Sequence, residues 1–147
     1  MKKLSRNVKI LVVLLLVFVF CDFLISPVVF ETRASALLGN SSSLRWLVVL
    51  FLGLFLNIAS IILLFIKPRV ASVIAIIGSI LYLIVTISDQ LGLVTPLKAP
   101  VLVSIVEVIT AVVLIGVFIF ASMVYRENPR KPSSGVMPVS KATTENK

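Results

Sequence analysis

The sequence predicts an all-α, polytopic membrane protein, an antiparallel four-helix transmembrane bundle with both termini in the cytoplasm. Three observations support this fold class: the composition, four separate apolar runs, and basic residues that gather in alternate connections. Hydrophobic residues make up 59% of the 147 residues, and the mean hydropathy is +1.17. Soluble domains are only about half apolar. The solvent for most of this chain is therefore predicted to be lipid.

The apolar runs have the length that a membrane span requires. A helix needs about 20 apolar residues to cross a hydrocarbon core of about 30 Å. The chain supplies four such runs, at residues 10–29, 46–66, 70–87 and 100–124. Together they form one transmembrane domain, residues 1–125. The segment 126–147 is rich in Pro, Ser, Thr and charge, and it is predicted to be a disordered basic cytoplasmic tail.

The segments between the runs predict three connections. Pro27 lies near the end of the first run, and a proline that removes a backbone donor is expected to bend that helix or to end it there, with the end of the helix favoured. The polar residues 30–45 then form a loop outside the membrane. Residues 67–69 read Lys-Pro-Arg and predict a tight hairpin turn, because a proline cannot continue the helix and two charges do not remain in hydrocarbon. Residues 88–99 form the second outside loop.

The 14 basic residues predict the orientation of the chain. Eleven of them lie in the N-terminal segment, the second connection and the tail: Lys2, Lys3, Arg6, Lys9, Lys67, Arg69, Arg126, Arg130, Lys131, Lys141 and Lys147. Only Arg33, Arg45 and Lys98 lie in the other two connections. Because cytoplasmic loops carry the excess of Lys and Arg, both termini are predicted to be cytoplasmic. The membrane itself is predicted to be the plasma membrane. The net charge of +8 thus reflects topology, and no nucleic-acid partner is expected.

Several kinds of chemistry lack their usual residues. The chain has no His and a single cysteine, Cys21, so it cannot form an internal disulfide or a His-based catalytic, haem or metal site. No phosphate-binding glycine loop is present. We therefore expect no cofactor, no metal site and no enzymatic activity. An intramembrane enzyme is the most distant alternative, because the Gly-Asp context of an intramembrane aspartyl protease is absent.

Small and polar residues recur at helical spacing within the runs, which predicts one protein-facing side for each helix. The third run carries the longest stripe: Ala71, Ala75, Ser79, Tyr82 and Thr86, with Gly78 alongside. This helix is therefore predicted to be central. The second run aligns Gly53, Asn57 and Ser60, the fourth aligns Ser104, Glu107 and Ala111 with Thr110 beside them, and the first places Asp22 one turn from Ser26.

Two carboxylates, Asp22 and Glu107, lie deep inside the apolar runs, where a charge is costly and usually functional. At 1.5 Å per residue they lie about 12 Å and about 10 Å below the outer boundary. Tyr82 falls in the same layer and Asn57 a little deeper. The sequence therefore predicts an intramembrane polar site, a candidate proton site, formed by Asp22, Asn57, Tyr82 and Glu107.

Two interpretations of this polar site remain open. If the two acids face each other in a low dielectric, one holds a proton at neutral pH, as in a proton relay or a cation site. Alternatively, the acids are protonated or hydrogen-bonded and hold helices together, or one of them meets a partner subunit. The sequence favours the second interpretation, because the acids are isolated in a small membrane protein.

The predicted function follows from the small soluble mass. With short connections there is little room outside the membrane for an active site. We expect a small multi-pass membrane protein without catalytic machinery, whose partners are the lipid bilayer and either a larger membrane complex, as an accessory or assembly subunit, or further copies of itself as a homo-oligomer. The alternative is a small proton- or cation-coupled transporter or channel that uses Asp22 and Glu107.

Overall fold

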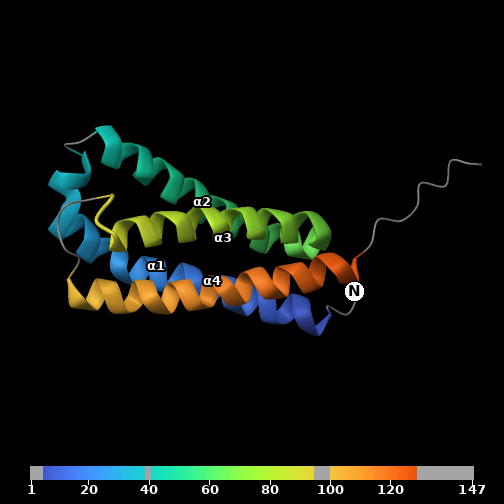
Figure 1. Ribbon diagram of the computed structural model, residues 1–147. Coiled ribbons are helices and arrows are strands. Elements are labelled where there is room, and N and C mark those ends of the chain that lie inside the picture. Colours follow the sequence, from blue (N-terminus) through green and yellow to red (C-terminus); the bar gives the residue numbers. More distant parts are fainter. Residues whose placement is uncertain (1–4, 39–40, 95–99, 129–147) are drawn as a thin grey trace, which may run out of the picture.

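The protein is a bundle of four antiparallel helices (Figure 1). The structure, a computed structural model, describes residues 5–38, 41–94 and 100–128. Within these residues there is no strand, and the helices are α1 (Arg6–Leu38), α2 (Ser41–Ile66), α3 (Pro68–Gln90) and α4 (Val101–Glu127). Each contains a stretch long and apolar enough to cross a membrane. The predicted fold class, an all-α four-helix transmembrane bundle, is confirmed.

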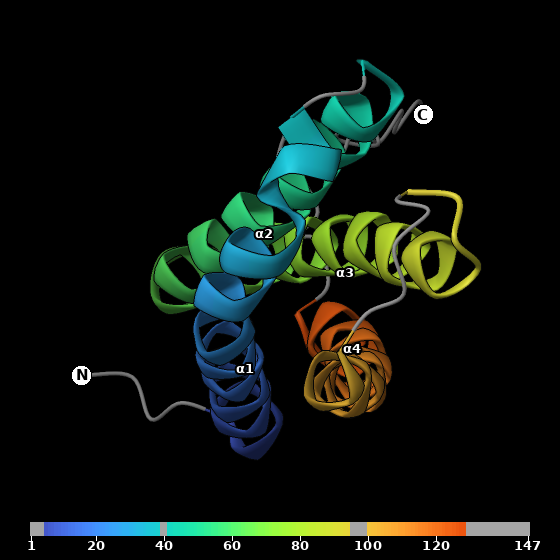
Figure 2. The same cartoon turned by 90° about the vertical axis from the view of Figure 1, so that its left-hand side faces the viewer.

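The bundle has two distinct ends. We call the end where α1 begins and α4 ends the terminal end, and the opposite end, where α1 is followed by α2 and α3 by α4, the loop end (Figure 1). Around the bundle, each helix packs against the one before and the one after it in the chain, and α4 closes the ring on α1. Figure 2 shows α3 crossing α4 at a large angle at the loop end.

The α2–α3 turn at the terminal end is as tight as the sequence predicts. Lys67 is the only residue between the two helices, with a non-helical backbone at φ −137° and ψ 76°. Pro68 follows as the first residue of α3, a position where its missing N–H costs nothing. The Lys67 carbonyl accepts the Ala71 amide at 3.0 Å, which starts the helix.

The first connection differs from the prediction. Pro27 does not end α1; the helix continues through it to Leu38, and α2 already begins at Ser41. The predicted loop 30–45 is therefore mostly helical. A proline removes one hydrogen bond from the ladder and bends a helix without necessarily ending it, and Figure 1 shows the last turns of α1 directed away from its axis. The stretch of α1 that is long and apolar enough to cross a membrane is Arg6–Val29.

Helices α3 and α4 also end later in the chain than predicted. The predicted loop at 88–99 begins too early, because α3 continues to Gln90 and places Asp89 in its last turn. The chain then turns at Gly92, whose positive φ of 72° suits glycine. α4 extends to Glu127, so the first two residues of the predicted tail are helical, and residues 129–147 lie outside the described residues.

The terminal half of the bundle is filled by an apolar core. Its buried members come from all four helices: Val8, Leu11, Leu15, Leu64, Ala71, Ala75, Val117, Ala121 and Val124. The small-residue stripe predicted on α3 is buried throughout, as is the α2 stripe. The α4 stripe is different: Thr110 is buried, but Ser104, Glu107 and Ala111 are only half-buried. The buried face of α4 is instead mainly β-branched and apolar, with Val103, Leu114 and Val117 at its centre.

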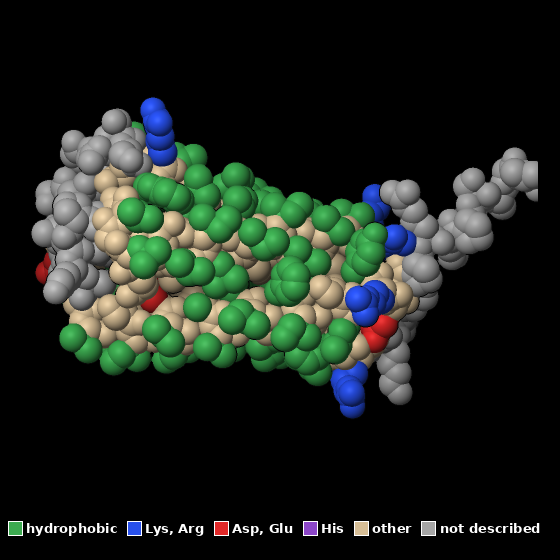
Figure 3. Space-filling view, viewed as in Figure 1, with side chains coloured by type: hydrophobic (Ala, Val, Ile, Leu, Met, Phe, Trp, Pro, Cys, Tyr) green, Lys and Arg blue, Asp and Glu red, His purple; other side chains and the backbone are tan. Residues whose placement is uncertain are grey.

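The surface matches a membrane environment. Hydrophobic side chains cover the length of the visible face, and Lys and Arg side chains gather mainly at the terminal end (Figure 3). Large apolar residues such as Phe23 and Val101 are 71% and 77% exposed, respectively. Contiguous apolar exposure of this extent is far beyond what soluble monomers show. The chain is an integral membrane protein.

Candidate functional site

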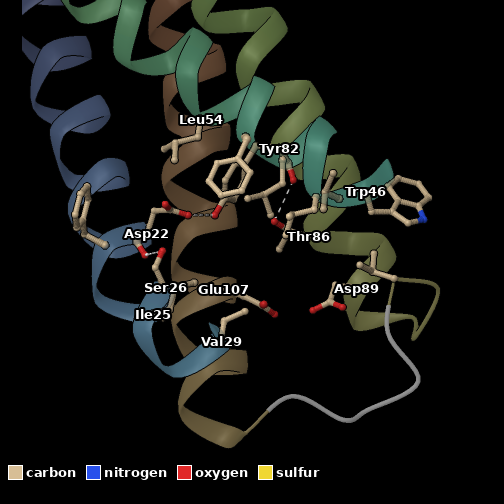
Figure 4. Close-up of a pocket in the computed structure, with 16 residues that line it drawn as sticks. Asp22, Ile25, Ser26, Val29, Trp46, Leu54, Tyr82, Thr86, Asp89 and Glu107 are labelled. Atoms are coloured by element: carbon tan, nitrogen blue, oxygen red, sulfur yellow. Dashed lines mark hydrogen bonds between the residues drawn. The ribbon is translucent and has the colours of Figure 1, made fainter. Parts of the chain in front are cut away.

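A cavity of about 320 Å³ lies in the loop-end half of the bundle, and all four helices line it (Figure 4). On α3 the lining residues are Tyr82, Val85, Thr86 and Asp89, at the i, i+3, i+4, i+7 spacing of a single helix face. On α1 the same spacing brings Asp22, Ile25, Ser26 and Val29 to the cavity. The polar residues of these two helices therefore reach one space because of their helical register.

The other two helices contribute unequal parts of the lining. All the described lining residues of α2 are apolar or aromatic: Trp46, Leu47, Leu50, Phe51 and Leu54. From α4 only Glu107 is among the described lining residues. The cavity thus combines an apolar wall on α2 with carboxylates from α1, α3 and α4.

Asp22 and Tyr82 are in direct contact. The Tyr82 hydroxyl donates a hydrogen bond to Oδ1 of Asp22, from α3 to α1 (Figure 4). Both side chains are buried, with 6% of Asp22 and 3% of Tyr82 exposed. The Tyr82 ring packs edge-on against Phe18, with centroids 4.8 Å apart and planes at 89°. This contact fixes the position of the Asp22 carboxylate across the bundle.

Glu107 lies on the same cavity together with Asp89, an acid that falls within the predicted loop 88–99. The carboxylates of Glu107 and Asp89 point toward one another from α4 and α3 (Figure 4), and the Gln90 side-chain amide donates to Oε2 of Glu107. The predicted site does not include Asp89, because the predicted third span ends at residue 87. The signal was nonetheless present: Asp89 follows Tyr82 by seven residues and continues its stripe.

Asn57, the fourth residue of the predicted site, is not among the described cavity-lining residues. It is fully buried between α2 and α3, where its side-chain amide donates to the Gly53 carbonyl at 2.9 Å. Its Oδ1 accepts the Ser79 hydroxyl at 3.3 Å, and its backbone carbonyl accepts the Ser60 hydroxyl at 2.6 Å. The structure thus brings Asp22, Tyr82 and Glu107 to one cavity and places Asn57 in the packing of two helices.

The Ser and Thr hydroxyls on the cavity wall bond to their own helices. Ser26 Oγ donates to the Asp22 carbonyl at 2.8 Å, and Thr86 Oγ1 donates to the Tyr82 carbonyl at 3.0 Å. Such bonds satisfy a hydroxyl without a partner helix. The carboxylates are consequently the groups that give the cavity its charge.

The arrangement of the acids limits the chemistry of the cavity. Among the described lining residues three are carboxylates and none is Lys or Arg. Within the described part of the chain no three of the His, Cys, Asp and Glu side chains are grouped so that they could hold a metal ion. The three acids are therefore distributed along the cavity, where each can exchange a proton or face a cationic group.

The terminal end is closed by polar contacts between helices. Arg69, on α3, donates to the Tyr125 hydroxyl at 2.9 Å, and its guanidinium carbon lies 4.5 Å from the centroid of that ring on α4. Glu127 accepts hydrogen bonds from Ser5 Oγ at 3.1 Å and from the Asn7 amide. The cavity and this closed end thus lie in opposite halves of the bundle.

No protein-family model, curated protein or solved structure matches this chain. The class of protein is therefore defined by the fold and the cavity alone: a small four-helix integral membrane protein with carboxylates on an internal cavity.

Proposed function

We propose that the protein is a small proton- or cation-coupled transporter or channel in which Asp22 and Glu107 bind the transported ion or the coupling proton. The single observation that carries this proposal is the cavity of about 320 Å³, onto which Asp22 and Glu107 face together with Asp89. An accessory subunit requires packed helices and an outer surface for its partner. It does not require an acidic cavity among its own helices.

The cost of burying acids supports a functional cavity. Ionisable residues inside membrane spans are expensive and typically mark ion pathways and proton relays. Here Asp22 is 6% exposed and is held by Tyr82, so its position is fixed. Asp22 also joins α1 to α3 through Tyr82, but it faces the cavity, whereas Asn57, which joins α2 to α3, does not line it.

The coupling of cation transport to proton movement follows from competition between the two for the same carboxylates. A proton and a cation compete for these carboxylates, because either one relieves the repulsion between like charges in a low-dielectric space. A cation that enters the cavity then displaces a proton. Passage to the other side requires that the closed terminal end, with Arg69 on Tyr125, opens.

The test is ion flux in liposomes that contain the purified protein. We expect proton or monovalent-cation flux above that of protein-free liposomes, and a loss of at least about tenfold for Asp22→Asn and Glu107→Gln, because each removes a charge from the cavity. Glu31→Gln is the matched control, because the Glu31 side chain is exposed and is not among the described cavity-lining residues. Its flux should equal that of the native chain.

Two outcomes would contradict the proposal. One is flux no greater than that of empty liposomes across protons, Na⁺ and K⁺, with a stoichiometric membrane partner in the mild-detergent preparation, which supports the accessory subunit. The other is flux that neither acid substitution changes, although both variants remain folded and monodisperse.

A further inference from the structure

We propose that the ligand of the cavity is a small amphipathic organic cation, an amine or quaternary ammonium with an aromatic or branched alkyl body. This inference rests on the proposed function and specifies its substrate class. It follows from the shape and chemistry of the lining: an uncharged apolar wall on one helix and carboxylates on the other three.

The apolar wall indicates a ligand with an apolar body. α2 presents Trp46, Leu50 and Leu54 over two helical turns, and the described part of this helix contributes no polar side chain to the lining other than the indole N–H. A bare ion gains nothing from such a wall. An apolar body of ligand gains about 25 cal/mol for each Å² that it removes from water.

The acids indicate a cationic head group that is not a metal ion. Asp22 lies at the level of Tyr82, and Asp89 lies seven residues further along α3, about 10 Å at 1.5 Å per residue. Two of the carboxylates, those of Asp89 and Glu107, face each other (Figure 4), and the three described acids of the cavity do not converge on one point. An organic ammonium group, with a single charge spread over several atoms, suits separated carboxylates better than a divalent ion, which needs several oxygen ligands close together.

The size and the aromatic residues of the cavity are consistent with the same ligand. A volume of about 320 Å³ is at the lower end of the roughly 300–1,000 Å³ typical of small-molecule pockets. It is many times the roughly 10–15 Å³ that holds one water molecule. Trp46 and Tyr82 add aromatic rings to the lining, and aromatic rings with carboxylates recognise organic ammonium groups.

The test compares three probes on the native chain in nanodiscs of uncharged phosphatidylcholine, with empty nanodiscs subtracted. Benzyltrimethylammonium carries both the charge and an apolar body. Neopentylbenzene has the same shape without the charge, and tetramethylammonium has the charge without the body. We expect benzyltrimethylammonium to bind at least about tenfold more tightly than either of the others.

Variants locate the binding in the cavity. Leu54→Trp fills the space beside Tyr82 and should abolish benzyltrimethylammonium binding, because Leu54 lines the cavity and packs against Tyr82. Asp89→Asn should weaken binding by at least about threefold, since it removes one of the three carboxylates. Glu127→Gln, outside the cavity, should bind like the native chain.

The outcomes separate this inference from the proposed function. Equal affinity for the charged and uncharged probes, or binding that Leu54→Trp leaves unchanged, overturns the organic-cation inference. If inorganic cations or protons are transported but none of the probes binds, the proposed function stands and the substrate class is wrong. If no flux is found but the cation binds selectively and Leu54→Trp abolishes this binding, the ligand class stands and transport is wrong.

Discussion

The contact between Asp22 and Tyr82 is the most specific residue-level feature of the bundle. It joins α1 to α3, helices that are not neighbours in the ring, and the Tyr82 ring is held in turn by Phe18. A hydroxyl that would otherwise face hydrocarbon gains a strong acceptor, and an acid gains a donor. The pair can therefore stabilise the fold as well as position a functional carboxylate.

We predict a measurable but modest coupling between these two residues. Hydrogen bonds between membrane helices average about 0.6 kcal/mol in double-mutant cycles, with a maximum near 1.7 kcal/mol. The cycle of Tyr82→Phe with Asp22→Ala should therefore give about 0.5–1.5 kcal/mol in the free energy of unfolding. Tyr82→Phe retains the ring against Phe18 and loses only the hydroxyl.

The control for this cycle pairs Asp22→Ala with Ser122→Ala. The Ser122 hydroxyl donates to the Phe118 carbonyl of its own helix at 2.8 Å, away from the cavity. Its coupling to Asp22 should be zero within error. A coupling for Tyr82 no larger than that of Ser122, measured by reversible unfolding in mixed micelles, would show that the Asp22–Tyr82 contact does not contribute to stability.

At the scale of helices, α2 and α3 are the closest pair. Gly53 and Gly78 let the two backbones approach: a Cβ atom at Gly78 would lie 3.0 Å from the Gly53 carbonyl oxygen and 3.0 Å from Asn57 Nδ2. Close approach through small residues is the usual way in which helices pack in a membrane. Asn57 then bonds on both sides of the crossing. These residues make α2 and α3 a rigid hairpin beside the cavity.

Gly78→Ala is predicted to destabilise the hairpin. The added methyl group meets backbone and a bonded amide that cannot move easily, and overpacking of this kind costs about 1–3 kcal/mol. Gly116→Ala is the matched control, since its Cβ would meet only the Leu14 side chain, at 3.3 Å and 3.7 Å. Thermal unfolding in the same detergent should show a lower midpoint for Gly78→Ala and an unchanged or higher one for Gly116→Ala.

The sequence predicted the elements better than their ends, for physical reasons. Long apolar runs identify membrane spans because lipid demands them. The ends of the helices lie where water and lipid meet, and there polar composition does not distinguish a loop from a helix that leaves the membrane. α1 therefore continues past Pro27 to Leu38, and α3 retains Asp89. A single missing backbone donor at Pro27 was too weak a signal to end a helix.

The sequence also predicts only part of the candidate site. Helical spacing and depth placed Asp22, Tyr82 and Glu107 in one layer, and they line one cavity. Depth alone does not give the rotation of a helix, so Asn57 was grouped with them although it faces α3. The cavity itself depends on the separation between helices near Trp46 and Val29. The spacing of residues within one helix does not give the distance between two helices.

At the scale of the whole molecule, the two halves of the bundle differ. The terminal half combines a filled apolar core with the contacts of Arg69 and Glu127, and the loop-end half holds the cavity. The basic side chains follow the same polarity (Figure 3). If the positive-inside rule orients the chain, the cavity lies in the outer half of the membrane and the closed end faces the cytoplasm.

This orientation predicts which cysteines a membrane-impermeant maleimide reaches in intact cells. In a Cys21→Ala background, Leu91→Cys places a thiol at the loop end, where Leu91 is 69% exposed, and Arg126→Cys places one on an exposed residue at the terminal end. Leu91→Cys should be labelled directly, whereas Arg126→Cys should be labelled only after permeabilisation. Ten of the eleven basic residues on the terminal side remain in Arg126→Cys, so the orientation should be retained. The reverse pattern would place the acidic cavity in the cytoplasmic half, and the cation would then be captured from inside the cell.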